Sequence, residues 1–393
     1  MSDGAEPGRE YKRWSNLVTL WRRMRPTVGA TAADVVHREN KWTLLRYRPR
    51  AEGVKYKTPL LLVPSIINRH YVLDLQPGKS FVEYFVAQGF DVYLLHWGTP
   101  GPEDRYLTFD EICDAYLGRA LRHVSRTSER DKAHVLGYCV GGTFTAIHAA
   151  VRPEHFASLT VLAAPVRFRD EGMLSTWAGN AAFEPGALVE AFGNAPWPLL
   201  QTTFQMLKPT LSLSKWVGLF DRAWDDEFVD SFFALETWIN DNVSLPGEAF
   251  RRFIDEMYRG DALVKGTFTL SGRPVHLHAI TCPTLAVTFE HDHIVPWQSA
   301  AVLLDHIAST DKERLHLNGG HVGSVVSRKA AQSLWPKLAA WWAARDAEPV
   351  PAVQEPEAQP ERVAVPRVVE AIPLTSAGAV KDGGRKRRAA AKR

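Results

Sequence analysis

A strand-like run that ends in a cluster of glycines, HVLGYCVGGT at residues 134–143, most constrains how this chain can fold. The pattern G-x-nucleophile-x-G, here Gly137, Cys139 and Gly141, marks a sharp turn from strand to helix that exposes one side chain. A side chain at either glycine would crowd that turn. The motif predicts Cys139 as a nucleophile, and the positive end of the following helix favours its thiolate form.

Short apolar runs alternate with helical segments on both sides of this turn. Strands that alternate with helices form a mostly parallel sheet with helices on both faces. We therefore expect the α/β class, in the α/β-hydrolase fold that carries such a nucleophile turn. The strand-like runs cover residues 59–66, 91–97, 133–136, 159–163 and 284–289, and the helical segments cover 80–88, 109–124, 142–151 and 300–306.

Residues 168–267 interrupt this alternation. They are rich in Trp, Phe and helix-forming residues, as in AWDDEFVDSFFALETWINDNV, and contain no strand-like run. We expect a helical cap over the active site that holds apolar substrate and excludes water. An added layer of core is the simpler alternative. The catalytic domain is expected to span residues 41–345.

The two ends of the chain differ from this domain. Residues 1–40 are expected to form an N-terminal helical segment, in which Trp14, Leu17, Leu20, Trp21 and Met24 share one face. That face could pack against the domain or meet a lipid or polymer surface. Residues 346–393 contain no aromatic residue and are expected to form a disordered tail. The tail has a basic end, which either solubilises the chain or contacts nucleic acid, a granule or an acidic partner.

Composition excludes several classes of protein. The chain has 393 residues, of which 45% are hydrophobic and 23% charged, as in ordinary globular proteins. No apolar run approaches the ~20 residues of a membrane span, and the N-terminus lacks the apolar core of a signal peptide, so we expect a cytoplasmic protein. Cys113 and Cys282 are expected to be buried apolar residues. No P-loop, dinucleotide fingerprint or metal-ligand spacing occurs, so neither a cofactor nor a metal is expected.

A cysteine nucleophile needs a base, and the base needs a group that orients it. In this architecture the order along the chain is nucleophile, acid, histidine. Asp292 lies just after a strand-like run, where such sheets carry active-site groups, with Glu290 as the alternative acid. His321 follows the last strand-like run in a glycine-rich turn, NGGHVG, that lets the backbone approach a substrate. His293 is expected to be structural or to support the site.

An oxyanion needs two backbone N–H donors in this fold. One is the amide of the residue after the nucleophile, Val140. The other comes from the loop after the strand at residues 59–64, which reads PSIINRHY. We expect Ile67 to supply it, with Ile66 as the next choice. Both would act through the main chain, so their side chains need not look catalytic.

Four stretches together resemble the poly(3-hydroxyalkanoate) synthases, which polymerise hydroxyacyl-CoA: LLVPSIINRHYVLDLQPGKSFVEYFVAQGFDVYLLHWG, LGYCVGGT, DHIVPW and GGHVGSV. The likeness runs from about residue 36 to residue 342 and places the family's catalytic residues on Cys139, Asp292 and His321. It is closest to the short, class III-like catalytic subunits, although Tyr138 follows the long members. The resemblance implies a homodimer, a second non-catalytic subunit and the surface of a polymer granule as partners.

The resemblance also implies a mechanism. Cys139, activated by His321, would take the acyl group of a (R)-3-hydroxyacyl-CoA as a thioester and release CoA. A substrate hydroxyl would then attack that thioester, activated by His321 or with the help of Asp292. Two alternatives stay open. One is a Cys-dependent hydrolase of the dienelactone hydrolase or thioesterase type, although dienelactone hydrolases are shorter and lack the INRHYVLDL loop and the large cap. The other is an inactive granule-associated scaffold.

Overall fold

The computed structural model describes residues 7–23 and 26–346. The predicted tail at 346–393 lies outside the described residues apart from Asp346, and so does Met24 of the predicted N-terminal face. Among the described residues, no helix is both long and apolar enough to cross a bilayer.

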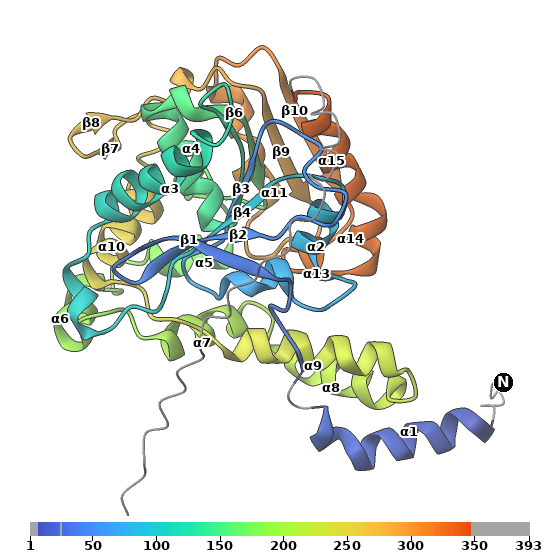
Figure 1. Ribbon diagram of the computed structural model, residues 1–393. Helices are drawn as coiled ribbons and strands as arrows, with labels where there is room; N and C mark the ends of the chain where they lie inside the picture. Colours follow the sequence, from blue (N-terminus) through green and yellow to red (C-terminus); the bar gives the residue numbers. More distant parts are fainter. Residues whose placement is uncertain (1–6, 24–25, 347–393) are drawn as a thin grey trace, which may run out of the picture. The chain divides into compact units, whose positions relative to one another are not determined.

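One eight-stranded sheet forms the centre of the molecule, in the order β1-β2-β4-β3-β5-β6-β9-β10 (Figure 1). The six strands from β4 to β10 in this order run parallel, and β2 and β1 continue the sheet as an antiparallel hairpin. The strands are β1 Ala33–Glu39, β2 Trp42–Tyr47, β3 Leu60–Val63, β4 Val92–His96, β5 Ala133–Tyr138, β6 Phe156–Leu162, β9 Thr284–Phe289 and β10 Lys312–Leu317. The α/β-hydrolase fold expected from the alternating pattern is confirmed.

The β1–β2 hairpin corrects one expectation. The sequence pattern places residues 33–39 within a helical segment over 1–40, but they form the edge strand of the sheet. Asn40 makes the turn possible, because asparagine tolerates the left-handed φ of 49° that it adopts there. The strand is hard to predict because its residues are mostly exposed or half-buried and lack a continuous apolar run.

Helices cover both faces of the sheet (Figure 1). On one side α3 and α4 pack together, and on the other α2 packs against α15, with Phe85 and Trp342 in edge-to-face contact. The indole of Trp342 also donates a hydrogen bond to Oγ1 of Thr160 on β6, 3.0 Å away, which fixes α15 to the sheet. The helices are α2 Phe81–Ala87, α3 Leu117–Ser125, α4 Val140–Val151, α11 Trp297–Ala301, α12 Leu303–His306, α13 Gly323–Val326, α14 Arg328–Ser333 and α15 Trp335–Ala343.

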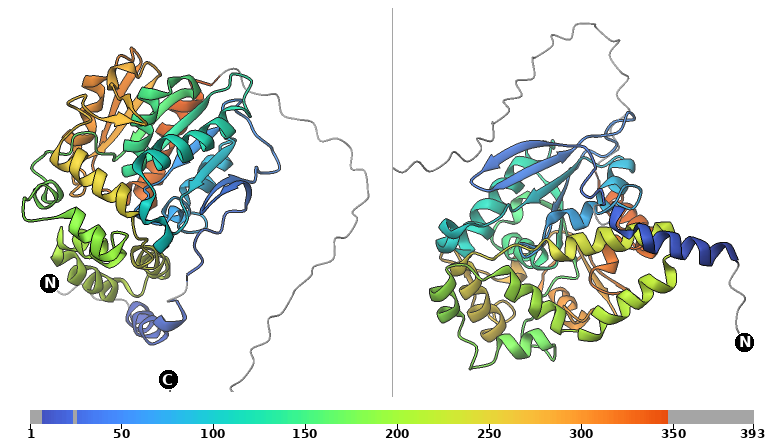
Figure 2. Two further views of the ribbon diagram at one scale, coloured as in Figure 1. Left: turned by 90° about the vertical axis from the view of Figure 1, so that its left-hand side faces the viewer. Right: turned by 90° about the horizontal axis from the view of Figure 1, so that it is seen from below.

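Between β6 and β9 the chain forms a series of helices that lie between residues 173 and 259, within the expected insertion (Figure 2). It contains α5 Met173–Ala178, α6 Pro185–Phe192, α7 Trp197–Met206, α8 Pro209–Arg222, α9 Asp226–Asn240, α10 Gly247–Arg252 and the π-helix η6 Phe253–Arg259. A small hairpin of β7 Thr269–Leu270 and β8 Arg273–Pro274 follows. The remaining short turns are η1 Leu20–Arg22, η2 His70–Asp74, η3 Pro102–Tyr106, the π-helix η4 Glu111–Tyr116, η5 Pro153–His155 and η7 Leu277–Ala279.

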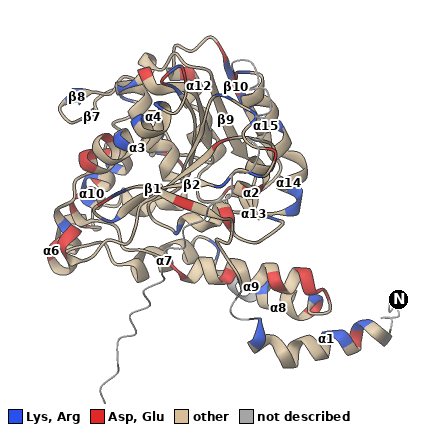
Figure 3. Ribbon diagram, viewed as in Figure 1, with Lys and Arg blue, Asp and Glu red and all other residues tan. Residues whose placement is uncertain are grey.

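The N-terminal helix, α1 Pro7–Thr19, packs against α8 and α9 of this insertion. Asn16 donates hydrogen bonds to the carbonyl of Ala223 and to Asp226, and Trp14 meets Phe220 edge to face. Charges of both signs lie along these three helices, and Lys12 and Arg23 pair with Asp226 (Figure 3). Part of the helix surface stays open, since Tyr11, Trp14, Val18 and Trp21 are all more than half exposed.

Candidate active site

The turn after β5 holds Cys139 in a strained conformation. Its φ of 55° and ψ of −130° lie where residues with a side chain are rarely found. The glycines around it explain how the turn can be so tight. A Cβ at Gly137 would lie 2.4 Å from Cα of Gly142, and one at Gly141 would lie 2.2 Å from the carbonyl oxygen of Val63. The strand–turn–helix geometry expected from the motif is therefore present.

Asp292 and His321 lie in contact, although 29 residues separate them in the chain. Oδ2 of Asp292 lies 2.8 Å from Nδ1 of His321, and both side chains are almost fully buried. The other carboxylate oxygen accepts backbone N–H bonds from Ile294 and Val295, at 2.9 Å each. These bonds hold the carboxylate in one orientation, so that it faces the imidazole.

His321 also reaches Cys139, which brings the three predicted residues together. Burial disfavours a charge on the imidazole, but the Asp292 carboxylate and the Cys139 sulfur outweigh burial and raise the pKa of His321 to about 10. Cys139 is thus close enough to His321 to affect its titration. Because Nδ1 is engaged with Asp292, Nε2 is the nitrogen left for the sulfur. The imidazole of His321 can thus take a proton from a thiol and keep it while a negative charge stays nearby.

Two residues hold His321 in place, and the sequence offers no signal for one of them. The ring of Tyr138 packs on the imidazole with 5.3 Å between ring centroids, and its hydroxyl donates to the His321 carbonyl at 3.3 Å. Ser324 donates to the same carbonyl at 2.6 Å. Tyr138 stands out in the sequence because it departs from the short family members. Ser324 looks like any serine in a loop.

The alternative acid and the nearby histidine have other environments. Glu290 is more than half exposed and binds Nε2 of His316 at 2.8 Å, so it does not face His321. His293 is half-buried, and burial together with the charge of Lys208 lowers its pKa. The acid that the structure brings to His321 is Asp292.

The two backbone N–H groups that are predicted to bind the oxyanion differ in whether they already donate a hydrogen bond. Val140 is the first residue of α4, so its N–H has no acceptor within the helix, and the Cys139 side chain does not cap it. The N–H of Ile67 donates to Oγ of Ser65 at 3.3 Å, a long hydrogen bond within the loop after β3. An oxyanion would have to replace the Ser65 hydroxyl at that amide. Nothing in the sequence indicates this competition.

The loop that carries Ile67 is fixed to the end of α9. The Asn68 amide donates to Oδ1 of Asn242 at 2.7 Å, and the Trp238 indole donates to the carbonyl of Arg69 at 2.8 Å. Arg69 and a neighbouring tyrosine both bind Asp241. Loop and cap are therefore positioned together.

Comparison with known proteins assigns the chain to a family. Residues 23–85 match a profile described as the N-terminus of poly-beta-hydroxybutyrate polymerase (PhaC), and residues 58–326 match the alpha/beta hydrolase fold. The poly(3-hydroxyalkanoate) polymerase subunit PhaC of Allochromatium vinosum is 35% identical over 80% of this chain and 88% of that protein. This chain belongs to the poly(3-hydroxyalkanoate) polymerase family. The polymerase subunit of Synechocystis sp. is 34% identical over 81% of this chain and 86% of that protein.

Some polymerase relatives are considerably longer. The match to the poly(3-hydroxyalkanoate) polymerase subunit of Haloferax mediterranei is 36% identical and covers 81% of this chain but 65% of that protein. Within this chain, the polymerase-specific profile takes in the β1–β2 hairpin, β3 and the loop that carries Ile67. A putative non-heme bromoperoxidase from Mycobacterium tuberculosis has the same fold, with a TM-score of 0.50 and 14% identity over 80% of this chain and all of that one.

Proposed function

We propose that this chain polymerises (R)-3-hydroxyacyl groups from CoA thioesters into a polyester, through a covalent intermediate on Cys139. The observation that carries the proposal is the buried Asp292–His321 pair, which faces Cys139 on its strained turn in a chain of the polymerase family. This arrangement has a nucleophile, a base and a group that orients the base.

Before the first half-reaction, the proton of the Cys139 thiol has passed to Nε2 of His321, whose raised pKa keeps it there. The sulfur attacks the thioester carbon, and the amides of Val140 and Ile67 hold the oxyanion that forms. The bond between that carbon and the CoA sulfur then breaks. The proton on His321 passes to the departing CoA thiolate, which leaves an acyl thioester on Cys139.

In the second half-reaction, the hydroxyl of another hydroxyacyl group attacks the acyl thioester. His321 takes the hydroxyl proton, while Asp292 keeps the imidazole oriented and stabilises its charged form. A new ester bond forms as the bond to the Cys139 sulfur breaks, and the proton returns to that sulfur. A cysteine suits this cycle because exchange between two thioesters is nearly balanced and leaves the acyl group reactive. The route uses no cofactor.

The test is a comparison of two cysteine variants. Cys139→Ala should release no CoA from (R)-3-hydroxybutyryl-CoA or (R)-3-hydroxyoctanoyl-CoA and should form no polymer. Cys282→Ala should keep the activity of the wild type, because burial raises the pKa of that thiol to about 11 and it lies outside the site. CoA release that survives in the Cys139 variant would refute the mechanism. A free hydroxy acid as the sole product would favour the hydrolase alternative.

The relatives in Allochromatium vinosum and Synechocystis sp. are named as polymerase subunits, which supports a second subunit. Activity should therefore be measured with and without a candidate second subunit. We also propose that the chain works as a homodimer. We also place it at the surface of a polymer granule in the cytoplasm. The exposed side chains Tyr11, Trp14 and Val18 on α1 and Trp21 on η1 support attachment there. Wild-type protein that binds granules yet never turns over, with or without partners, would favour the scaffold alternative.

A further inference from the structure

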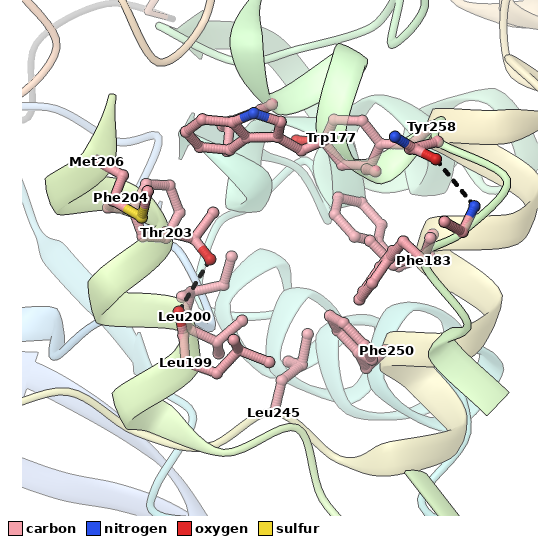
Figure 4. A pocket seen from close by; sticks show the side chains of 17 residues that line it. Trp177, Phe183, Leu199, Leu200, Thr203, Phe204, Met206, Leu245, Phe250 and Tyr258 are labelled. Carbon is pink, nitrogen blue, oxygen red and sulfur yellow. Dashed lines mark hydrogen bonds between the residues drawn. The ribbon is translucent and has the colours of Figure 1, made fainter. Parts of the chain in front are cut away.

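A cavity of about 520 Å³ lies among the cap helices, and Ile67 from the loop after β3 also lines it. Its walls come from α5, the segment after it, α7, and the run of α10 and η6 (Figure 4). The lining is almost entirely hydrocarbon and aromatic. The large side chains that face the space include Trp177, Phe183, Leu200, Phe204, Phe250 and Tyr258.

Two of the lining residues connect the cavity to the catalytic groups. Ile67 lines the cavity. Its backbone amide is also the one that we expect to hold the oxyanion. Tyr258 is partly buried and lies close enough to Cys139 that the charge of the sulfur raises the pKa of its phenol, after the larger effect of desolvation. An acyl group on Cys139, with its carbonyl oxygen at Ile67, would thus have the cavity beside it.

Two of the few polar side-chain groups in the lining already accept or donate a hydrogen bond within their own segment. Oγ1 of Thr203 donates to the carbonyl of Leu199 at 2.9 Å, and Oδ1 of Asn180 accepts the N–H of Ala182 at 2.8 Å (Figure 4). The pantetheine arm of CoA, with two amides, would leave hydrogen bonds unmade here, which disfavours its burial in this cavity. A segment of finished polyester would also place its many ester oxygens against walls that are mostly hydrocarbon and aromatic. The occupant that fits such walls is an alkyl chain.

We propose that this cavity holds the alkyl side chain at C3 of the hydroxyacyl group, so that the preferred substrates are medium-chain (R)-3-hydroxyacyl-CoA thioesters such as the octanoyl form. This inference rests on the proposed function and names its substrate class. The single methyl group of a 3-hydroxybutyryl unit would leave most of the cavity unfilled. A longer chain fills it, and each added methylene contributes about 0.8 kcal/mol, which is about fourfold in kcat/KM.

The first experiment measures kcat/KM for the (R)-3-hydroxybutyryl, hexanoyl and octanoyl thioesters. We expect the value to rise at least tenfold from butyryl to octanoyl. Ala178 lies in the wall and is buried, so Ala178→Leu should reduce the octanoyl rate at least tenfold and leave the butyryl rate within about twofold. Ala340→Leu, on the exposed side of α15, is the matched control and should change neither rate. Thr203→Leu fills the same space from α7 and replaces Ala178→Leu if that variant unfolds below the assay temperature.

A second measurement separates this inference from the proposed reaction. In Cys139→Ala, (R)-3-hydroxyoctanoate should raise the thermal midpoint more than (R)-3-hydroxybutyrate, and adding Ala178→Leu or Thr203→Leu should remove the difference. Equal shifts for the two acids, or rates that fall from butyryl to octanoyl, would overturn the inference. Chain-length-dependent binding without any CoA release would instead refute the proposed function and leave the alkyl site standing.

Discussion

Nε of Arg69 donates a hydrogen bond to Oδ1 of Asp241 over 2.9 Å, and this pair joins the loop after β3 to the end of α9. Tyr71 donates to the other oxygen of the same carboxylate, also at 2.9 Å. Since the loop carries Ile67, a single side chain in the insertion helps to set the position of a predicted oxyanion donor. We therefore predict that Asp241 acts as a positioning residue rather than a catalytic one.

Asp241→Asn should lower kcat about tenfold or more while KM changes little, because a small displacement of an oxyanion donor affects the transition state most. Asp34→Asn is the control, since it breaks an exposed pair with Arg48 on the β1–β2 hairpin. The rate of the first CoA release, measured under single-turnover conditions, should fall in parallel with kcat. Equal activity of the two variants would show that the Arg69 pair is only structural.

Asp292→Asn should reduce kcat at least a hundredfold and lower the pKa of His321. The neutral amide can no longer offset burial, which by itself disfavours the charged imidazole. NMR titration of His321 in the wild type and the variant measures the shift directly. Glu290→Gln is the control, because that carboxylate binds His316 instead. A His321 titration that does not move would exclude the coupling to Asp292.

The raised pKa of His321 also predicts how stability depends on pH. The folded protein holds this proton up to about pH 10, whereas the usual value in an unfolded chain is 6.5. The contribution to the free energy of unfolding is therefore complete below about pH 6.5 and is lost as the pH rises toward 10. The stability difference between wild type and His321→Gln, measured by urea unfolding, should shrink across that window. A constant difference from pH 6.5 to 10 would contradict the assignment.

Two glycine-to-alanine substitutions, one in the nucleophile turn and one in α8, should have opposite effects on the stability of the protein. Ala at position 142 would place its Cβ 2.3 Å from Cβ of Ala164, so Gly142→Ala should destabilise the protein by about 1–3 kcal/mol or more. Gly218 lies inside α8, where an added Cβ would have nothing within 4 Å, and Gly218→Ala should stabilise by about 0.5–1 kcal/mol. Thermal and urea unfolding of both variants measure the difference. A Gly142→Ala protein as stable as the wild type would contradict this packing.

The inner parallel strands, β3, β4, β5, β6 and β9, could be predicted from the sequence because they are buried on both faces, unlike the edge strand β10. Such strands are continuous apolar runs, as in Leu60–Val63. The edge hairpin could not be predicted, since a strand with one open side carries polar residues. The π-helices could not be predicted either, because they differ from α-helices only in hydrogen bonding. Cys139, Asp292 and His321 could be predicted from the sequence because each lies next to a glycine turn or a strand end. Their supporting contacts, such as those of Ser324 and Asp241, depend on distant segments.

The alkyl cavity has one further consequence, because much of its wall comes from one stretch of chain. Leu174, Trp177, Ala178, Phe183, Leu200, Phe204 and Met206 all lie within 33 consecutive residues, from 174 to 206, whereas Cys139, Asp292 and His321 lie outside it. Exchange of that segment between relatives would alter the monomer that is selected without touching the chemistry. The choice of monomer and the formation of the ester bond can then change independently in evolution. The composition of the polyester depends on a segment that can be exchanged between relatives.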